Sequence, residues 1–144
     1  MNIFEEIYSG IKEAKKAYAT ATNTAEQDAA RNLYEKAAEK IDDLNSTEQR
    51  IWRAYETAKD CGNEYIDLND TNRDDAVEDL VACMKEYGIE AFTFSSTWSG
   101  AVEAAWLFQK AGCSLTGLLE INSQYKDLVS NEYEKMPAYL FVVK

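Results

Sequence analysis

The chain has 144 residues, of which 46% are hydrophobic and 12% aromatic, with one proline and six glycines. This composition is typical of a globular domain and excludes a disordered or low-complexity chain. The 26 acidic residues outnumber the 15 basic ones, and the net charge of −11 argues against direct binding to nucleic acid, because phosphate contacts need a basic surface.

Histidine is absent from the chain, and its absence limits the chemistry that the sequence supports. Without histidine the chain lacks the commonest general base and cannot form Ser-His or Cys-His nucleophile pairs. It also lacks a ligand of nearly all mixed-ligand zinc sites. Cys61, Cys83 and Cys113 are too few and too widely spaced for a disulfide framework, so we expect buried, reduced thiols. The sequence therefore predicts a protein that is not an enzyme and has no metal or other cofactor.

The ends of the chain show no export or membrane signal. The first ten residues, MNIFEEIYSG, carry acidic residues where a signal peptide has positive ones, and no apolar segment follows. The longest strongly apolar run, AYLFVV, is far shorter than the roughly 20 residues that span a bilayer. We expect a soluble protein of the cytoplasm.

Two amphipathic helices are predicted at the start of the chain. Apolar residues at spacings of three and four predict a first helix over residues 3–18. Thr24 and Gln27 fit a capping box, and they predict a second helix over roughly residues 25–44. The core side of the second helix should contain Ala29, Leu33, Ala37, Ile41 and Leu44.

Two further helices follow. The third should begin with the pair Ser46 and Gln49 and end at Gly62-Asn63. A fourth is predicted over roughly residues 73–87, and Gly88 is suited to end it. Its core side should consist of Val77, Leu80, Val81 and Met84.

After Gly88 the apolar period changes from that of a helix to that of a strand. Residues 89–96, IEAFTFSS, predict a first strand, and residues 98–112 predict a fifth helix. Alternation over residues 113–122, CSLTGLLEIN, predicts a second strand, and the terminal AYLFVVK predicts a third. The polar residues 123–135 between them have room for a helical turn.

These elements predict an α+β fold, in which a helical N-terminal half of three to four helices packs with a small three-stranded sheet carrying one crossover helix. If the first two strands lie side by side and parallel, the helix between them makes a right-handed crossover, and the last strand can pair antiparallel with either. The sequence has no linker or repeat, so we expect a single domain over residues 1–144, divisible into a helical subdomain 1–66 and an α/β subdomain 67–144.

The junction between the first strand and the fifth helix is rich in hydroxyl groups: Ser95, Ser96, Thr97 and Ser99. Backbone N–H groups at a helix N-terminus can bind an anion, so one interpretation is a small-ligand or anion-binding domain. The junction lacks the glycines and lysine of a P-loop, and serine and threonine are also ordinary helix caps. The anion site is therefore the alternative hypothesis.

The segment DLNDTNRDDAVEDL, residues 67–80, is densely acidic. Aligned with an EF-hand loop, it places oxygen-bearing residues at positions 1, 3, 5, 9 and 12: Asp67, Asn69, Thr71, Asp75 and Glu78. However, Asn72 occupies the position that requires glycine, and Gly62-Asn63 interrupts the helix that should precede the loop. We therefore expect no calcium site.

A helix start explains part of this acidic segment. Thr71 and Asp74 make a suitable N-terminal cap, and aspartates in a first turn complement the helix dipole. Asn72 and Asp75 are an alternative pair. Residues 60–90 contain ten acidic and two basic residues, so this window carries −8 of the net charge of −11. At about 100° per residue, four acids share the face opposite the predicted core: Asp75, Glu78, Asp79 and Glu86.

Such a concentration of charge favours a binding patch over general solubility, which scattered charge would serve as well. Its natural complement is a basic protein surface that itself holds nucleic acid. The partner-binding residues predicted on this basis are Asp67, Asp70, Asp74, Asp75, Glu78, Asp79 and Glu86.

The segment AFTFSSTWSGAVEAAWLFQKAGCSLTGLLEINSQY, followed by EYEKMPAYLFVV, resembles the C-terminal part of small acidic proteins carried on bacterial mobile genetic elements and phages. The resemblance includes no catalytic motif and no functional residue. It implies a setting, because accessory proteins of such elements include inhibitors of restriction and CRISPR nucleases, some of which mimic nucleic acid. We therefore expect a non-enzymatic interaction protein that binds a nucleic-acid-handling protein, as a nucleic-acid mimic or as an inhibitor of a host defence nuclease.

Overall fold

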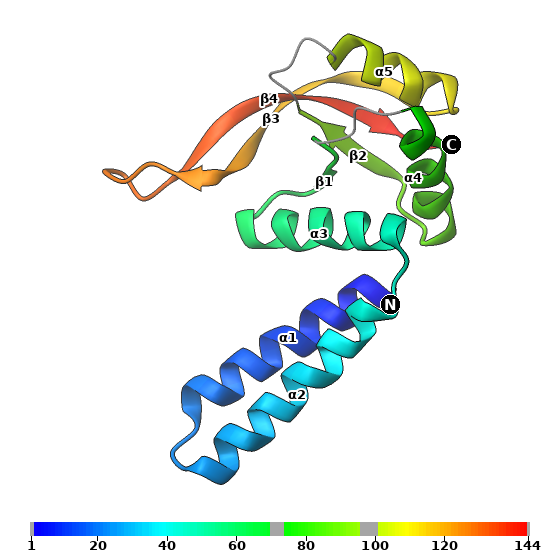
Figure 1. Ribbon diagram of the computed structural model, residues 1–144. Coiled ribbons are helices and arrows are strands. Elements are labelled where there is room, and N and C mark those ends of the chain that lie inside the picture. Colours follow the sequence, from blue (N-terminus) through cyan, green and yellow to red (C-terminus); the bar gives the residue numbers. More distant parts are fainter. Residues whose placement is uncertain (1, 70–73, 96–100, 144) are drawn as a thin grey trace. The chain divides into compact units, whose positions relative to one another are not determined.

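The computed structural model describes residues 2–69, 74–95 and 101–143, without the side chains of residues 74–76 (Figure 1). Within these ranges the chain has five helices and a four-stranded mixed sheet, which confirms the α+β class. In chain order the elements are α1 (Ile3–Thr20), α2 (Thr24–Asp42), α3 (Ser46–Cys61), β1 (Ile66–Asp67), α4 (Asp74–Glu86), β2 (Ala91–Phe94), α5 (Ala101–Lys110), β3 (Ser114–Lys126) and β4 (Tyr133–Val142).

The chain forms two compact units, Met1–Trp52 and Arg53–Lys144. The boundary falls inside α3, earlier than the division expected between residues 66 and 67. The end of α3 belongs to the second unit because hydrogen bonds tie it to the sheet. Asn122 Nδ2 donates to the Cys61 carbonyl oxygen at 2.8 Å, and the Tyr133 hydroxyl donates to the Asp60 carbonyl oxygen at 3.0 Å.

In the first unit, α1 and α2 pack against each other as a helical hairpin (Figure 1). A Cβ on Gly10 would lie 3.6 Å from the Ala37 Cβ, so the two helices approach closely there. Ala30 is buried, whereas Ala29 and Leu33 are exposed, which corrects the predicted core side of this helix. The Leu33 side chain is 41% exposed.

The caps of α2 and α3 lie one residue before the predicted ones. At α3 the Asn45 Oδ1 accepts from the Glu48 N–H at 2.8 Å, and the Glu48 Oε1 accepts from the Asn45 N–H at 3.1 Å, a reciprocal capping box. Asn23 is the corresponding N-cap of α2. Asparagine caps a helix as well as serine or threonine does, so the pattern could not distinguish Asn23 from Thr24, or Asn45 from Ser46.

The strand order in the second unit is β1-β2-β4-β3. β1 is parallel to β2, and β4 is antiparallel to both of its neighbours, β2 and β3. The first two predicted strands, now β2 and β3, are therefore not adjacent, and the last strand pairs with both instead of one. The expected three-stranded sheet gains β1, whose two residues are too few to produce a periodic pattern.

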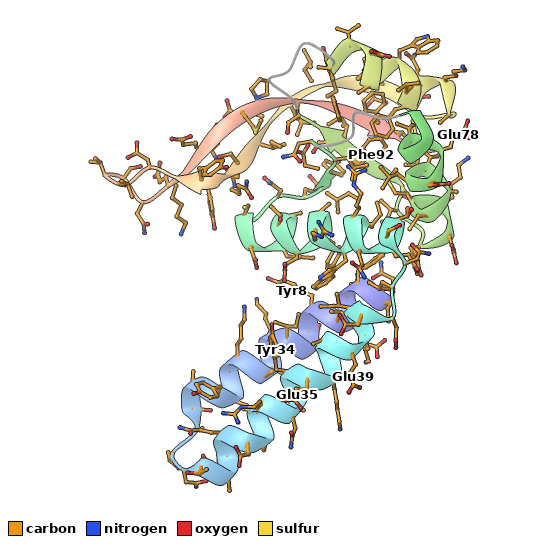
Figure 2. All side chains as sticks on the ribbon, viewed as in Figure 1. Tyr8, Tyr34, Glu35, Glu39, Glu78 and Phe92 are labelled. Carbon is orange, nitrogen blue, oxygen red and sulfur yellow. The ribbon has the colours of Figure 1, made fainter. Side chains whose placement is uncertain are left out.

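Four phenylalanines form the core on the α5 side of the sheet. The rings of Phe92 on β2 and Phe141 on β4 are stacked with centroids 5.3 Å apart. Phe108 from α5 lies over both, at 4.9 Å from Phe92 and 5.5 Å from Phe141, and Phe94 is 5.8 Å from Phe108. This cluster fixes α5 on one face of the sheet (Figures 1 and 2).

The polar residues 123–135 form the distal end of the β3–β4 hairpin and its turn, where the sequence had left room for a helical turn. β3 continues to Lys126 and β4 begins at Tyr133. In the connecting turn the Asp127 carboxylate accepts from the Val129 N–H at 2.7 Å, and Asn131 has a left-handed φ of 58°. Side-chain acceptance by aspartate and a left-handed asparagine are common turn devices, and they explain why this polar stretch reverses the chain tightly.

Candidate interaction surface

α4 is an amphipathic helix whose apolar side is buried in the second unit. Val77, Leu80, Val81 and Met84 are all buried, as predicted. The helix ends as expected at Gly88, which has a φ of 72°, a conformation that glycine adopts without steric cost. The Ile89 N–H then donates to the Met84 carbonyl oxygen at 2.8 Å, which satisfies a free carbonyl at the helix end.

The opposite side of α4 is acidic and open to solvent. Glu78, Asp79 and Glu86 are exposed on this helix, and Glu78 is labelled in Figure 2. In the described part of the chain, none of these three carboxylates has a hydrogen bond or an ion pair. The three side chains are thus exposed to solvent and have no contact of this kind with any other described residue.

Lys85, the basic residue of α4, acts on a different neighbour. Burial raises the pKa of the Cys113 thiol, and the Lys85 ammonium group partly opposes this rise. Lys85 is therefore close enough to the junction of α5 and β3 to influence Cys113 electrostatically.

Asp67, which we predicted as a partner-binding residue, lies on β1 and its carboxylate is hydrogen-bonded within the sheet. Its Oδ1 accepts from the Thr93 hydroxyl at 2.7 Å and its Oδ2 from the Ser95 hydroxyl at 2.5 Å. Thr93 and Ser95 are only 0% and 1% exposed. The carboxylate satisfies two buried donors at the point where β1 pairs with β2.

The other predicted residues are only partly described. Asp70 lies outside the described residues, and only the backbone is described for Asp74 and Asp75. At the predicted anion site, Ser96, Thr97 and Ser99 lie outside the described residues as well. Ser95 already donates to Asp67, and this carboxylate would repel an anion at the Ser95 hydroxyl. The anion site stays a prediction for the other three residues.

Comparison with known proteins identifies a family for the second unit. The family described as Domain of unknown function (DUF7698) matches residues 50–143, well over half of the chain. The chain belongs to the DUF7698 family. No curated protein and no solved structure gives a significant match. The DUF7698 match begins close to the unit boundary at Arg53, so it includes α4 and the sheet, whereas α1 and α2 lie outside it.

The thiols of the DUF7698 domain are poor nucleophiles. Cys61 and Cys113 are buried, and burial raises the pKa of both. The Asp60 carboxylate raises the pKa of Cys61 further, while Lys126 partly opposes the rise. Both thiols therefore stay protonated at neutral pH, and the thiolate is the reactive form.

Among the described residues, no three or more cysteine, aspartate and glutamate side chains lie together so that they could hold a metal ion. No helix within the described ranges is long and apolar enough to cross a membrane.

The contact of Asp67 with Thr93 and Ser95 was missed in the sequence. A signal for it exists, because Thr93 and Ser95 are two residues apart and share one face of the predicted strand, opposite Phe92 and Phe94. Two hydroxyls on a buried strand face require acceptors. The sequence contains many carboxylates that could serve, and only the pairing of β1 with β2 selects Asp67.

Proposed function

We propose that this protein is a non-enzymatic interaction protein, and that the acidic face of α4 binds a basic surface of a nucleic-acid-handling protein. The observation that carries the proposal is a set of three exposed carboxylates on α4 that have no partner in the described part of the chain: Glu78, Asp79 and Glu86. They lie in the window of residues 60–90, which holds most of the net negative charge.

The spacing of these carboxylates suits mimicry of nucleic acid. At about 1.5 Å per residue, Glu78 and Glu86 are separated by about 12 Å along the helix. One strand of DNA presents about three to four phosphates over the same length, at about 3.4 Å each. α4 thus offers a comparable row of negative charge to a surface made for phosphates, and complementary charge speeds and orients such encounters.

The resemblance of the C-terminal segment to proteins of mobile genetic elements narrows the class of partner protein. The C-terminal segment resembles proteins of mobile genetic elements and phages, and such elements benefit from blocking the defence nucleases of their host. We therefore favour a CRISPR effector nuclease or a restriction endonuclease as the partner, and occupation of its nucleic-acid-binding surface as the mode of inhibition.

The proposal is tested with the triple variant Glu78→Lys, Asp79→Lys, Glu86→Lys. A panel of purified restriction endonucleases and CRISPR effector nucleases is passed over the immobilised protein, and DNA cleavage is measured in parallel. We expect binding that high salt and competing DNA both weaken, and at least about a hundredfold loss in the triple variant, because like charges then face each other across the interface.

The matched control is the triple variant Glu13→Lys, Glu35→Lys, Glu39→Lys. It changes the net charge equally, through exposed acids of α1 and α2, outside the family match; Glu35 and Glu39 are labelled in Figure 2. Binding should stay within about threefold of the wild type, because these acids belong to the other compact unit and not to the exposed face of α4. Equal loss in both variants would show that net charge, and no particular face, governs binding.

A further inference from the structure

β3 is an edge strand with an uncovered N-terminal part. It pairs only with β4 in the described part of the sheet, so one side of its backbone faces away from the other strands. The four consecutive residues 115–118 are all exposed, although alternate residues of a strand point to opposite faces. Neither face of the sheet is therefore covered at this segment.

A β-bulge places two leucines together on this edge. The register with β4 shifts between Leu115 and Gly117, so Leu115 lies opposite Phe141 and Leu118 opposite Tyr139. Phe141 and Tyr139 share one face of β4, and residues opposite each other share a face too. Without the bulge the two leucines would point to opposite faces. With it, Leu115 (43% exposed) and Leu118 (71% exposed) form one apolar strip on the α5 side.

Towards the C-terminal end of β3, the side chain of Asn63 covers the backbone edge of the strand at Asn122. Asn63 Nδ2 donates to the Asn122 carbonyl oxygen at 2.8 Å, and the Asn122 N–H donates to Asn63 Oδ1 at 2.9 Å. The Asn63 carboxamide thus pairs with the backbone of β3 as a neighbouring strand would. Before this contact, the edge is open over residues 114–120, a length typical of a paired strand.

Charge distinguishes this edge from the rest of the molecule. Residues 101–126 contain two acids, Glu103 and Glu120, and two lysines, Lys110 and Lys126, so their net charge is zero in a chain of net charge −11. A second copy can approach here without the repulsion that the acidic face of α4 would impose. An apolar, neutral strip is also complementary to itself, whereas a basic partner gains nothing from it.

We propose that two copies of this chain associate edge to edge through residues 114–120 of β3. The two strands run antiparallel across a two-fold axis near Leu118, so the Leu115 and Leu118 strips of both copies cover each other. This contact removes the exposed strand edge, which in a lone chain is an aggregation hazard. It leaves α4 free, and it does not depend on the proposed function.

The test is the mass in solution by sedimentation equilibrium over a wide range of protein concentration. The chain has a mass of 16.3 kDa, and we expect the wild type to approach twice this value. Leu118→Glu places two like charges beside the axis, and it should lower the apparent mass twofold. The matched control is Leu128→Glu, which makes the same substitution at a leucine that is 100% exposed in the β3–β4 turn, and it should leave the dimer intact.

A second measurement does not depend on a new charge. Leu118→Cys should give a covalent dimer under mild oxidation, because the natural cysteines are buried, whereas Val129→Cys in the turn should not. Three outcomes overturn the proposal: a wild type that stays at 16.3 kDa, a dimer that survives Leu118→Glu, or equal cross-linking of the two cysteine variants.

Discussion

Asp67 on β1 and Glu78 on α4 lie in one acidic stretch of sequence, but the two carboxylates have different surroundings. Asp67 is half-buried and accepts hydrogen bonds from Thr93 and Ser95. Glu78 is exposed and has no partner in the described part of the chain. A run of like charges in sequence therefore need not form one surface, because the surroundings of each carboxylate depend on the helix or strand that carries it.

The largest expected effect is a loss of stability on substitution of Asp67. Asp67→Ala removes the acceptor of two buried hydroxyls, and each buried donor left without a partner costs about 1–3 kcal/mol. We therefore expect the free energy of unfolding to fall by about 2–4 kcal/mol in chemical denaturation. Glu78→Ala should change it by less than about 0.5 kcal/mol, as for other surface substitutions.

A double-mutant cycle separates the hydrogen bonds from general damage to the strand. Ser95→Ala combined with Asp67→Ala should cost less than the sum of the two single changes, because one interaction is then counted twice. Additive losses would mean that Asp67 stabilises the sheet by another route.

A smaller effect on stability is expected from neutralising the exposed carboxylates of α4. The isosteric variant Glu78→Gln, Asp79→Asn, Glu86→Gln removes three charges without changing the packed side of the helix. Its free energy of unfolding should rise by a few tenths of a kcal/mol at low salt, because like charges on one helix face repel. The gain should disappear at about 1 M salt, where charges are screened beyond about 3 Å. A loss of stability would reveal a structural contact of these carboxylates.

The smallest effect on stability concerns alkaline pH and the thiol of Cys113. Burial raises the pKa of Cys113 above its ordinary value of 9.0, so the unfolded chain releases this proton more readily than the folded one. The stability due to the thiol is complete below pH 9.0 and is lost as the pH rises through the folded-state pKa. The stability of Cys113→Ala should therefore fall less steeply with pH than that of the wild type. Equal slopes would indicate a solvated thiol.

Periodicity alone located most of the elements. The apolar spacing of Val77, Leu80 and Met84 predicted α4, and the structure buries all three. The alternation around Phe92 and Phe94 predicted β2, where both side chains are buried. These predictions hold because burial of one helix face or strand face is a local pattern, repeated within a few residues.

The features that the sequence could not predict depend on partners distant in the chain. β1 has two residues and exists only because it pairs with β2. β4 lies between β2 and β3, an order that no local pattern encodes. Of the candidate surface, the sequence predicted Glu78, Asp79 and Glu86 from helical spacing, but it could not distinguish the surroundings of Asp67 from theirs, because hydrogen-bond partners are chosen by tertiary contact.

By itself, therefore, the sequence determined the α+β class, the positions of the long helices and strands, and the concentration of negative charge in residues 60–90, since these follow from composition and short-range periodicity. The tertiary structure decided which carboxylates are exposed to solvent and which accept hydrogen bonds from buried groups. It also placed Leu115 and Leu118 together at the β3 edge. The reason is physical: whether a side chain meets solvent or a partner depends on segments that are remote in sequence and are brought together only when the sheet forms.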